Sequence, residues 1–195
     1  MGIEPAKSLE ESTEQLTATN FSYLPLRCLS PKLYEIIELR PLIGLRSPVH
    51  TLARMINPFN APYMLQGIFH PGYSPVHQQA ASLLNQPHLA VMKGEGGEIE
   101  RNPDMECLVQ SVHNGNLSEE IWPPMFKRRH IKDNNLQPEH LMALWKDEIA
   151  DEYAQGAVIG TLAIALQLLE KVDNIKQAYE MAEQMWNSRD KLAIF

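Results

Sequence analysis

The sequence predicts an α/β fold in which a parallel β-α-β unit is followed by a β-hairpin and flanking helices. Two apolar runs, at residues 63–69 and 88–93, have the length of buried strands, and segment 75–85 between them has apolar residues at helical spacing. The dipeptide Asn114-Gly115 separates two further strand-like runs and favours a two-residue hairpin turn. From Pro138 onward, apolar residues again recur at helical spacing.

Helices are predicted throughout the amino-terminal third. Residues 8–18 form a helical pattern with an acidic outer face. Three Ser-Pro pairs then mark helix starts, because serine accepts hydrogen bonds from the free amides of a first turn and proline fits the first helical position. These pairs are Ser30-Pro31, Ser47-Pro48 and Ser74-Pro75, and the helix after the second is expected to stop before Pro58.

The predicted strands follow a defined connectivity. A crossover from strand 63–69 through helix 75–85 to strand 88–93 is almost always right-handed and makes the two strands parallel. The hairpin comes next, with strand-like runs at 107–112 and 117–122. We therefore expect the two parallel strands of the sheet to precede the hairpin strands in the sequence.

The carboxyl-terminal part is predicted to be helical. Residues 152–170 are apolar on nearly every side and predict a buried helix. The acidic residues near the start of this helix crowd like charges at a spacing where they repel. We interpret them as a solvated acidic face, formed by Asp147, Glu148, Asp151 and Glu152.

Length and composition are those of one globular domain over residues 1–195. The formal net charge of −7 argues against a dominant, sequence-independent grip on nucleic acid. Cys28 and Cys107 are isolated and make no disulfide framework, which indicates a reducing compartment. Residues 1–20 lack the apolar core of a signal peptide, and the longest apolar run, 157–169, is too short to span a bilayer. We therefore expect a cytoplasmic protein without membrane association.

The segment most suggestive of chemistry is residues 93–103, Lys-Gly-Glu-Gly-Gly-Glu-Ile-Glu-Arg-Asn-Pro, at the end of a predicted strand. Its three glycines allow a tight turn and a close approach to a ligand. Glu95, Glu98 and Glu100 favour a cation, or a substrate whose phosphates arrive with Mg²⁺. Ligands of open α/β sheets collect at the carboxyl ends of the strands, where this turn would lie. A solvated loop is the alternative interpretation.

Five segments, taken in order, form a specific combination. They are Gly44-Leu45-Arg46-Ser47-Pro48-Val49-His50-Thr51-Leu52, Ile56-Asn57-Pro58, Gln66-Gly67-Ile68-Phe69-His70-Pro71, Lys93-Gly94-Glu95-Gly96 and the Ala-rich helix from Ala157. This combination resembles the carboxyl half of the anthranilate phosphoribosyltransferase family. The closest resemblance is to the anthranilate phosphoribosyltransferase-like branch, a paralogous group of glycosyl transferase family proteins in which the run Gly-Glu-Gly-Gly-Glu-Ile-Glu-Arg-Asn-Pro is typical.

The resemblance implies the carboxyl-terminal part of a nucleoside phosphorylase/phosphoribosyltransferase-like α/β domain, from a paralogue of a tryptophan-biosynthesis enzyme. Members of the family transfer a phosphoribosyl group from phosphoribosyl pyrophosphate (PRPP) to an aromatic amine, with Mg²⁺, and a homodimer is expected. The family's Gly-Thr-Gly-Gly-Asp pyrophosphate loop and His-Gly-Asn-Arg segment do not occur in this sequence, nor does its amino-terminal helical domain. We therefore expect a truncated glycosyl transferase that is incomplete or inactive as this fragment.

The resemblance also implies roles for individual residues, although it assigns no catalytic residue. Arg46 stands where the family's arginine contacts anthranilate, and a guanidinium binds a carboxylate through two parallel hydrogen bonds. Glu98 stands at the first of two acids that bind Mg²⁺; Ile99 occupies the second place, so Glu100 is the expected substitute. Other family residues of the anthranilate site are replaced, which argues against anthranilate as the acceptor. The replacing residues are His50 and Ala53-Arg54.

The sequence contains candidates for two other kinds of site, one for nucleic acid and one for a metal ion. The one dense basic run predicts nucleic-acid binding as an alternative function, since the paralogous branch includes members regarded as nucleic-acid binders; a solvated basic loop is the simpler interpretation. The residues of this run that we assign to the alternative are Lys127, Arg128, Arg129 and Lys132. A histidine metal site is disfavoured, because His70 and His77 lie on either side of a helix start and no other pair shows ligand spacing on one face.

Overall fold

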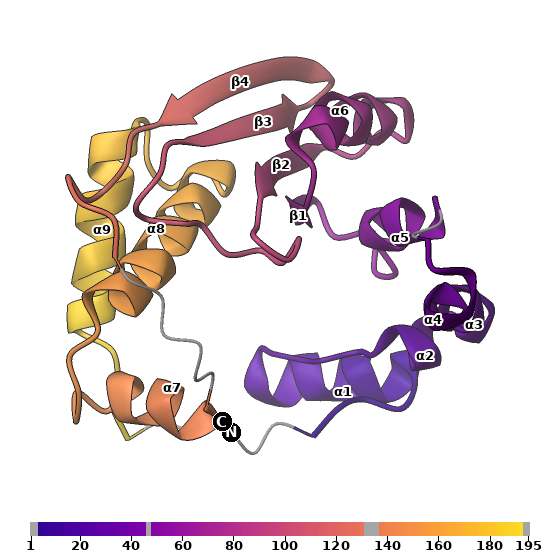
Figure 1. Cartoon of the computed structure of the whole chain (residues 1–195), viewed down its shortest axis with the longest axis horizontal. Coiled ribbons are helices and arrows are strands. Elements are labelled where there is room, and N and C mark those ends of the chain that lie inside the picture. The colour runs from indigo at the N-terminus through magenta and orange to yellow at the C-terminus, as the bar shows by residue number, and fades with distance from the viewer. Residues whose placement is uncertain (1–3, 46–47, 131–136, 193–195) are drawn as a thin grey trace. The chain divides into compact units, whose positions relative to one another are not determined.

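The computed structural model describes residues 4–45, 48–130 and 137–192 (Figure 1). The described residues form two compact units, a smaller one within Met1–Ala61 and a larger one, Pro62–Leu192. The prediction of a single α/β domain over residues 1–195 stays a prediction. None of the helices in the described ranges combines the length and the apolar character that a membrane span requires.

The smaller unit is helical. Its first helix, α1, begins after Ser8, whose hydroxyl accepts a hydrogen bond from the backbone N–H of Glu11 at 3.2 Å. It ends at Asn20, which adopts the left-handed conformation that commonly closes a helix. The elements of this unit are α1 (Leu9–Thr19), α2 (Leu26–Leu29), α3 (Pro31–Glu38), α4 (Arg40–Ile43), α5 (Val49–Leu52) and the 3₁₀ helix η1 (Ala53–Met55).

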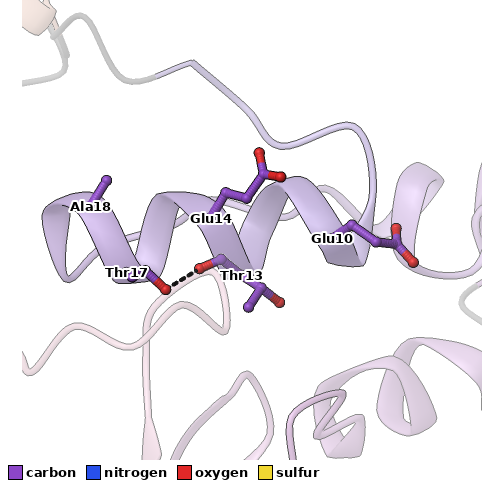
Figure 2. Close-up of a pocket in the computed structure, with 5 residues that line it drawn as sticks. All are labelled: Glu10, Thr13, Glu14, Thr17 and Ala18. Atoms are coloured by element: carbon purple, nitrogen blue, oxygen red, sulfur yellow. Dashed lines mark hydrogen bonds between the residues drawn. The ribbon is translucent and has the colours of Figure 1, made fainter.

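An open hollow of about 560 Å³ lies along one face of α1 (Figure 2). The residues that line it are Glu10, Thr13, Glu14, Thr17 and Ala18. The two threonine hydroxyls already donate to main-chain carbonyls within the helix, those of Leu9 and Thr13. Since the lining side chains come from one helix face and the hydroxyl donors are engaged, the hollow offers little to fix a ligand.

Two of the Ser-Pro pairs, Ser30-Pro31 and Ser74-Pro75, mark helix starts but do not cap them as expected, and Ser47 lies outside the described residues. α3 begins at Pro31, yet the side chain of Ser30 makes no capping hydrogen bond. Ser74 is itself the first residue of its helix, and Tyr73 takes the capping position. The helix after Pro48 is short and gives way to η1, which ends before Pro58 as predicted.

A four-stranded sheet of order β1-β2-β3-β4 forms the centre of the larger unit. Its strands are β1 (Tyr63–Ile68), β2 (His88–Lys93), β3 (Cys107–His113) and β4 (Asn116–Trp122). β1 and β2 are parallel, and β3 pairs antiparallel with both β2 and β4. Asn114 and Gly115 have φ angles of 49° and 83°, the left-handed values that a tight hairpin turn requires. The predicted β-α-β unit and hairpin are both confirmed, and they share one sheet.

Helices cover both faces of this sheet (Figure 1). α6 (Ser74–Leu83) follows the 3₁₀ helix η2 (Pro71–Tyr73) and packs on one face, where Leu89 and Val91 of β2 are buried. α8 (Glu152–Leu168) and α9 (Ile175–Asn187) pack on the other face, where Ala90 and Met92 are buried. α7 (Pro138–Trp145) precedes α8. Because β2 is apolar on both sides, its sequence is a continuous apolar run.

Candidate functional site at the carboxyl ends of the parallel strands

The Gly-rich turn lies across the carboxyl ends of both parallel strands. It begins where β2 ends, at Lys93. The backbone N–H of Gly94 donates to the carbonyl oxygen of Ile68, the last residue of β1, at 3.0 Å. The segment is therefore placed where open α/β sheets bind their ligands.

Two glycines are required because the turn folds back onto the strand ends. A Cβ at Gly67 of β1 would lie 2.2 Å from the carbonyl oxygen of Glu98, and one at Gly94 would lie 2.0 Å from the same atom. Any larger residue at either position would push the main chain of the turn away from the sheet. Gly97 has a φ of 91°, which side-chain-bearing residues rarely adopt.

The two predicted metal ligands lie close together on the exposed side of the turn. One carboxylate oxygen of Glu98, Oε2, accepts a hydrogen bond from the backbone N–H of Gly96 at 2.7 Å. Glu98 and Glu100 are both exposed residues. Partial desolvation of the Glu100 carboxyl by the surrounding chain raises its pKa, and the negative charge of Glu98 raises it further. A carboxyl group whose ionisation is disfavoured by a neighbouring acid fits a divalent cation, which would relieve the repulsion.

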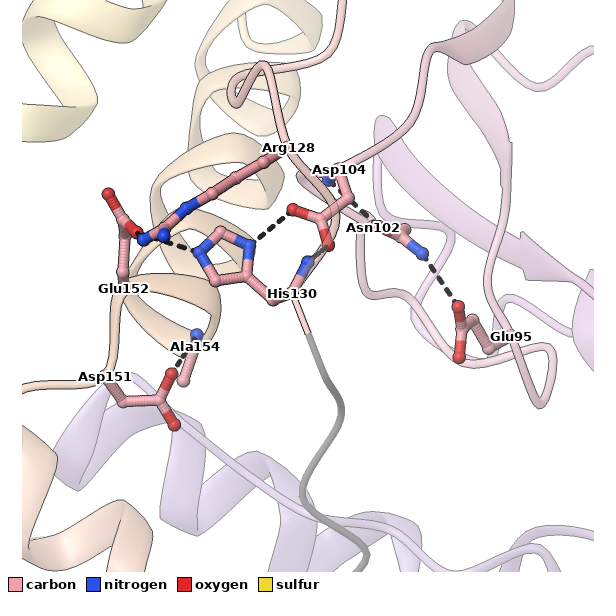
Figure 3. Close-up of polar contacts among 8 residues, drawn as sticks. All are labelled: Glu95, Asn102, Asp104, Arg128, His130, Asp151, Glu152 and Ala154. Atoms are coloured by element: carbon pink, nitrogen blue, oxygen red, sulfur yellow. Dashed lines mark hydrogen bonds and ion pairs between the residues drawn. The ribbon is translucent and has the colours of Figure 1, made fainter.

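A chain of hydrogen bonds connects the turn to the residues that follow it (Figure 3). The side-chain amide of Asn102 donates to Glu95 Oε1 at 2.7 Å. The backbone N–H of Asp104 donates to the Asn102 side-chain oxygen at 3.0 Å. Asn102 thus joins the acidic turn to Asp104.

His130 continues this chain to the first turn of α8. Its ring Nδ1 lies 2.6 Å from Asp104 Oδ1, and its backbone N–H donates to Asp104 Oδ2. Its Nε2 lies 2.8 Å from Glu152 Oε2, an oxygen that also accepts from Arg128 at 3.0 Å. We call the set Asp104, His130, Glu152 and Arg128 the clasp.

The clasp favours the charged form of each titrating member. Hydrogen bonding to Glu152, then to Asp104, raises the pKa of His130. Hydrogen bonds from His130 and then Arg128 lower the pKa of Glu152. Burial acts to raise the pKa of Asp104, but the backbone and ring hydrogen bonds of His130 outweigh it and the pKa is lowered. A carboxylate at each ring nitrogen favours the protonated form of the imidazole.

The turn and the clasp share a negative electrostatic field. Burial, followed by the charges of Glu100, Asp104, Glu98 and Asp151, raises the pKa of the Tyr153 phenol. Carboxylates of the turn and of the clasp therefore act on one phenol at the start of α8. Such a field favours a cation or a cation-bound phosphate over a free anion.

Arg101 ends the turn inside the core. Its residue surface is fully buried, and its guanidinium lies over the rings of Trp122 at 5.6 Å and Tyr179 at 5.5 Å. Its backbone N–H donates to the hydroxyl of Thr161 on α8 at 2.9 Å. The turn is thus fixed at one end by the strands and at the other by α8.

Comparisons with known proteins show what the chain is similar to. No family model matches the chain. An uncharacterized protein of Aquifex aeolicus is 32% identical over 114 residues, 58% of this chain and 36% of that protein. The anthranilate phosphoribosyltransferase of Sulfolobus acidocaldarius is 24% identical over 193 residues, 92% of this chain and 54% of that protein. Over most of its length the chain is thus similar to anthranilate phosphoribosyltransferases.

Solved structures show that the fold is also that of the family. Anthranilate phosphoribosyltransferase from Thermus thermophilus matches with a TM-score of 0.76 at 21% identity, over 96% of this chain and 57% of that one. The Saccharomyces cerevisiae enzyme in complex with PRPP and Mg matches with a TM-score of 0.70 at 18% identity, over 91% and 54%. The chain spans about half the length of these relatives. The predicted fold, a phosphoribosyltransferase-like α/β domain in its carboxyl-terminal part, is confirmed.

The residues that the sequence assigned to ligands are only partly brought together. Glu98 and Glu100 share the turn. Arg46 and Lys132 lie outside the described residues. Lys127, Arg128 and Arg129 are exposed, and Arg128 pairs with Glu152 at 3.0 Å. The basic run is therefore partly engaged by the acidic start of α8.

Of the four acids predicted to form a solvated face, Asp147, Glu148 and Glu152 are exposed and Asp151 is half-buried, but three of the four also have specific partners. Asp147 forms ion pairs with Arg189 and Lys191. Asp151 caps α8 by accepting from the backbone N–H of Ala154 at 2.9 Å, and it also pairs with His140 at 3.0 Å. Glu152 belongs to the clasp. The cationic partners of Asp147 and Glu152 lie more than 20 positions away in the sequence, so the like-charge spacing alone did not predict these ion pairs.

Sequence reasoning missed Asp104 and the role of His130. The two residues are 26 positions apart and meet only because the hairpin returns the chain to the turn. The backbone N–H of Met125 donates to the carbonyl oxygen of Pro103 at 2.8 Å and holds that return in place. In the sequence, His130 belongs to a basic run, which hides its acidic partners.

Proposed function

We propose that this chain takes part in pentosyl transfer of the anthranilate phosphoribosyltransferase type by holding the phosphates of a PRPP-like substrate together with Mg²⁺. The observation that carries the proposal is the acidic, Gly-rich turn laid across the carboxyl ends of β1 and β2. Glu98 and Glu100 are the proposed Mg²⁺ ligands, and the main chain of the turn approaches the phosphates closely. When bound, Mg²⁺ would neutralise phosphate charge during transfer.

The comparisons support the reaction class more than the substrate. Relatives that match most of this chain are named anthranilate phosphoribosyltransferases, and one matching structure is a complex with PRPP and Mg. We propose Arg46 as the residue that binds the acceptor, because a guanidinium suits a carboxylate. We also propose that sequence equivalent to the other half of these relatives completes the site, and that the protein assembles as a homodimer.

The proposal is tested by mapping metal binding on the turn. Mn²⁺ is a paramagnetic substitute for Mg²⁺, so its binding should broaden the amide resonances of Gly94, Gly96 and Gly97, and Mg²⁺ should compete. Glu98→Gln and Glu100→Gln should each weaken the effect at least about tenfold, because each removes a proposed ligand. Glu106→Gln is the matched control, since Glu106 is an exposed acid just beyond the turn.

Two outcomes would overturn the proposal. Broadening centred away from the turn would place the metal elsewhere. Equal broadening in the Glu98→Gln and Glu106→Gln variants would show that general acidity, rather than the predicted ligands, attracts the ion. If PRPP in addition fails to strengthen Mn²⁺ binding, the turn holds a metal without the proposed substrate.

Nucleic-acid binding is a second candidate function, favoured by the exposure of Lys127 and Arg129 in the basic run. Such a function predicts DNA retention that weakens as salt rises. Lys127→Ala combined with Arg129→Ala should reduce retention, whereas Lys32→Ala with Arg40→Ala, which removes two exposed charges elsewhere, should not. Arg128 is left intact because its loss would also break the clasp. Equal retention by both double variants would remove this function.

A further inference from the structure

Two histidines face each other across neighbouring strands. His88, the first residue of β2, is the register partner of His113, the last residue of β3. Their Nδ1 atoms are 3.2 Å apart. The ring of Tyr63 stacks on His88 with 4.5 Å between ring centres and so fixes the orientation of that imidazole. The pair is thus held by sheet register and by packing.

A carboxylate completes a group of three possible ligands. Glu170 follows the carboxyl end of α8, which packs on this face of the sheet. One ring nitrogen from each histidine and one carboxylate oxygen of Glu170 all lie within 4.8 Å of one another. His88 is 7% exposed, whereas Glu170 is an exposed residue. The group therefore has a buried side and a side open to solvent.

The spacing suits a tetrahedral metal ion. Bonds of about 2.0–2.1 Å from zinc to nitrogen at a tetrahedral angle separate two ligand nitrogens by about 3.3 Å. The observed 3.2 Å between the Nδ1 atoms is close to that value. Two imidazoles and one carboxylate are a donor set of the zinc class, whereas Mg²⁺ prefers oxygen ligands alone.

The backbone at Glu170 adds a second observation. Its φ is 55°, and every other described non-glycine residue with a positive φ is Asn or Asp. Asn, Asp and glycine occupy this conformation more readily than glutamate does. A longer carboxylate side chain is therefore present at a position where the local backbone favours other residues.

Room for further ligands lies beside His113. A cavity of about 100 Å³ separates part of the sheet face from α8, and His113 is among its lining residues. Polar side chains also face this cavity, namely Ser111, Ser118, Glu120 and Gln167. A polar cavity of this size can hold water.

We propose that His88, His113 and Glu170 form a binding site for a divalent ion of the zinc class, with water completing a tetrahedral set. The ion would take the place of the proton between the two Nδ1 atoms, and that proton would move through solvent to Nε2 of the same ring, so that both imidazoles bind as neutral ligands. The site is separate from the acidic turn, since His88 begins β2 and the turn starts at its far end, Lys93. It does not depend on pentosyl transfer.

The same geometry could instead be a hydrogen bond between two neutral imidazoles. A Co²⁺ titration of the untagged full chain distinguishes a metal site from such a hydrogen bond. Tetrahedral Co²⁺ with nitrogen ligands has characteristic visible absorption, and Zn²⁺ should displace it at one ion per chain. His113→Gln should lower the affinity at least about tenfold. His88 is left intact because of its burial.

Glu170→Asn is the most informative variant. Asn suits the left-handed backbone, so the variant should fold as well as the parent protein while its Co²⁺ affinity falls at least about tenfold. Asp173→Asn, a matched loss of an exposed carboxylate three positions away, should leave the affinity unchanged. Absence of tetrahedral absorption, or affinity unaffected by His113→Gln, would overturn the proposal in favour of the imidazole hydrogen bond.

Discussion

Arg101 and Arg189 both lie against pairs of aromatic rings, yet their guanidinium groups are satisfied very differently. Arg189 lies 3.7 Å from the centre of the Trp186 ring and 5.6 Å from that of Trp145. It donates to the main-chain carbonyls of Trp145 at 2.9 Å, Trp186 at 2.7 Å and Leu144 at 3.2 Å, and it pairs with Asp147. It therefore joins the carboxyl end of α7 to that of α9.

Arg101 has far fewer partners. Its side chain donates to the carbonyl oxygen of Pro123, while Nε and Nη1 have no hydrogen-bond partner among the described residues. The indole N–H of Trp122 and the hydroxyl of Tyr179 are also buried without a partner there. Burial lowers the pKa of Arg101 and raises that of the neighbouring Cys107 thiol, so the thiol stays neutral and does not offset the charge. Besides that one hydrogen bond, the two rings stabilise this cation.

The difference between the two arginines shows where the fold tolerates the free-energy cost of a buried charge with few hydrogen-bond partners. Arg189 lies at the ends of two helices, where free carbonyls need donors. Arg101 lies at the end of the acidic turn, and its main chain is fixed by Thr161 of α8. Gly160 leaves space for it, since a Cβ there would lie 3.0 Å from Arg101 Cδ. We infer that Arg189 stabilises the fold, whereas Arg101 positions the turn at little or no gain in stability.

The largest effect is expected from Arg189→Met. The substitution keeps much of the apolar stem but removes one donor from each of three helix-end carbonyls, together with the ion pair to Asp147, so it should lower the free energy of unfolding by about 3 kcal/mol. Urea denaturation followed by circular dichroism measures this loss. A loss below about 1 kcal/mol would mean that solvent satisfies those carbonyls equally well, and the proposed contrast would fail.

A smaller effect is expected from Thr161→Val. This substitution leaves the backbone N–H of Arg101 without its acceptor and should cost about 1–2 kcal/mol. Thr17→Val in α1 is the matched control, because Thr17 also donates to a main-chain carbonyl one turn earlier but is exposed. Similar unfolding curves for the two variants would show that the anchor on α8 contributes nothing.

Arg101→Met should change stability least of the arginine substitutions, by less than about 1 kcal/mol in either direction, because it replaces an incompletely satisfied buried charge with an apolar side chain. Its effect should appear instead in the turn, as altered amide resonances of Gly94 and Gly97. If Arg101→Met costs as much stability as Arg189→Met, Arg101 is a structural clamp of the same kind.

Local features of the sequence predicted the fold well, because their causes lie within a few residues. Asn114-Gly115 specified the hairpin, and the run 88–93 matched β2 residue for residue. Features that depend on strand register were missed. His88 and His113 are 25 positions apart, and no periodicity shows that they face each other. The rings around Arg101 come from a strand and a helix, so burial of its charge could not be predicted from the turn alone.

The clasp differs from both arginines because its cation titrates. The pKa of His130 is raised, so its contribution to stability is complete below the unfolded value, about 6.5, and is lost as pH rises through the higher folded value. The lowered pKa values of Asp104 and Glu152 make their contributions complete above about pH 4–4.5 and lost at lower pH. The clasp should therefore be strongest between about pH 5 and 6.5.

Comparison of His130→Gln with the parent protein tests this window. The stability advantage of the parent, measured by urea denaturation, should be largest in that window and decline as pH rises above it. His70→Gln, which alters an exposed histidine, should show no such dependence. The effect should be the smallest of those considered, because Arg128 and Glu152 are well exposed and solvent screens their charges. An advantage that stays constant from about pH 5 to about pH 9 would show that His130 acts through packing against Phe126 and Tyr153 rather than through its charge.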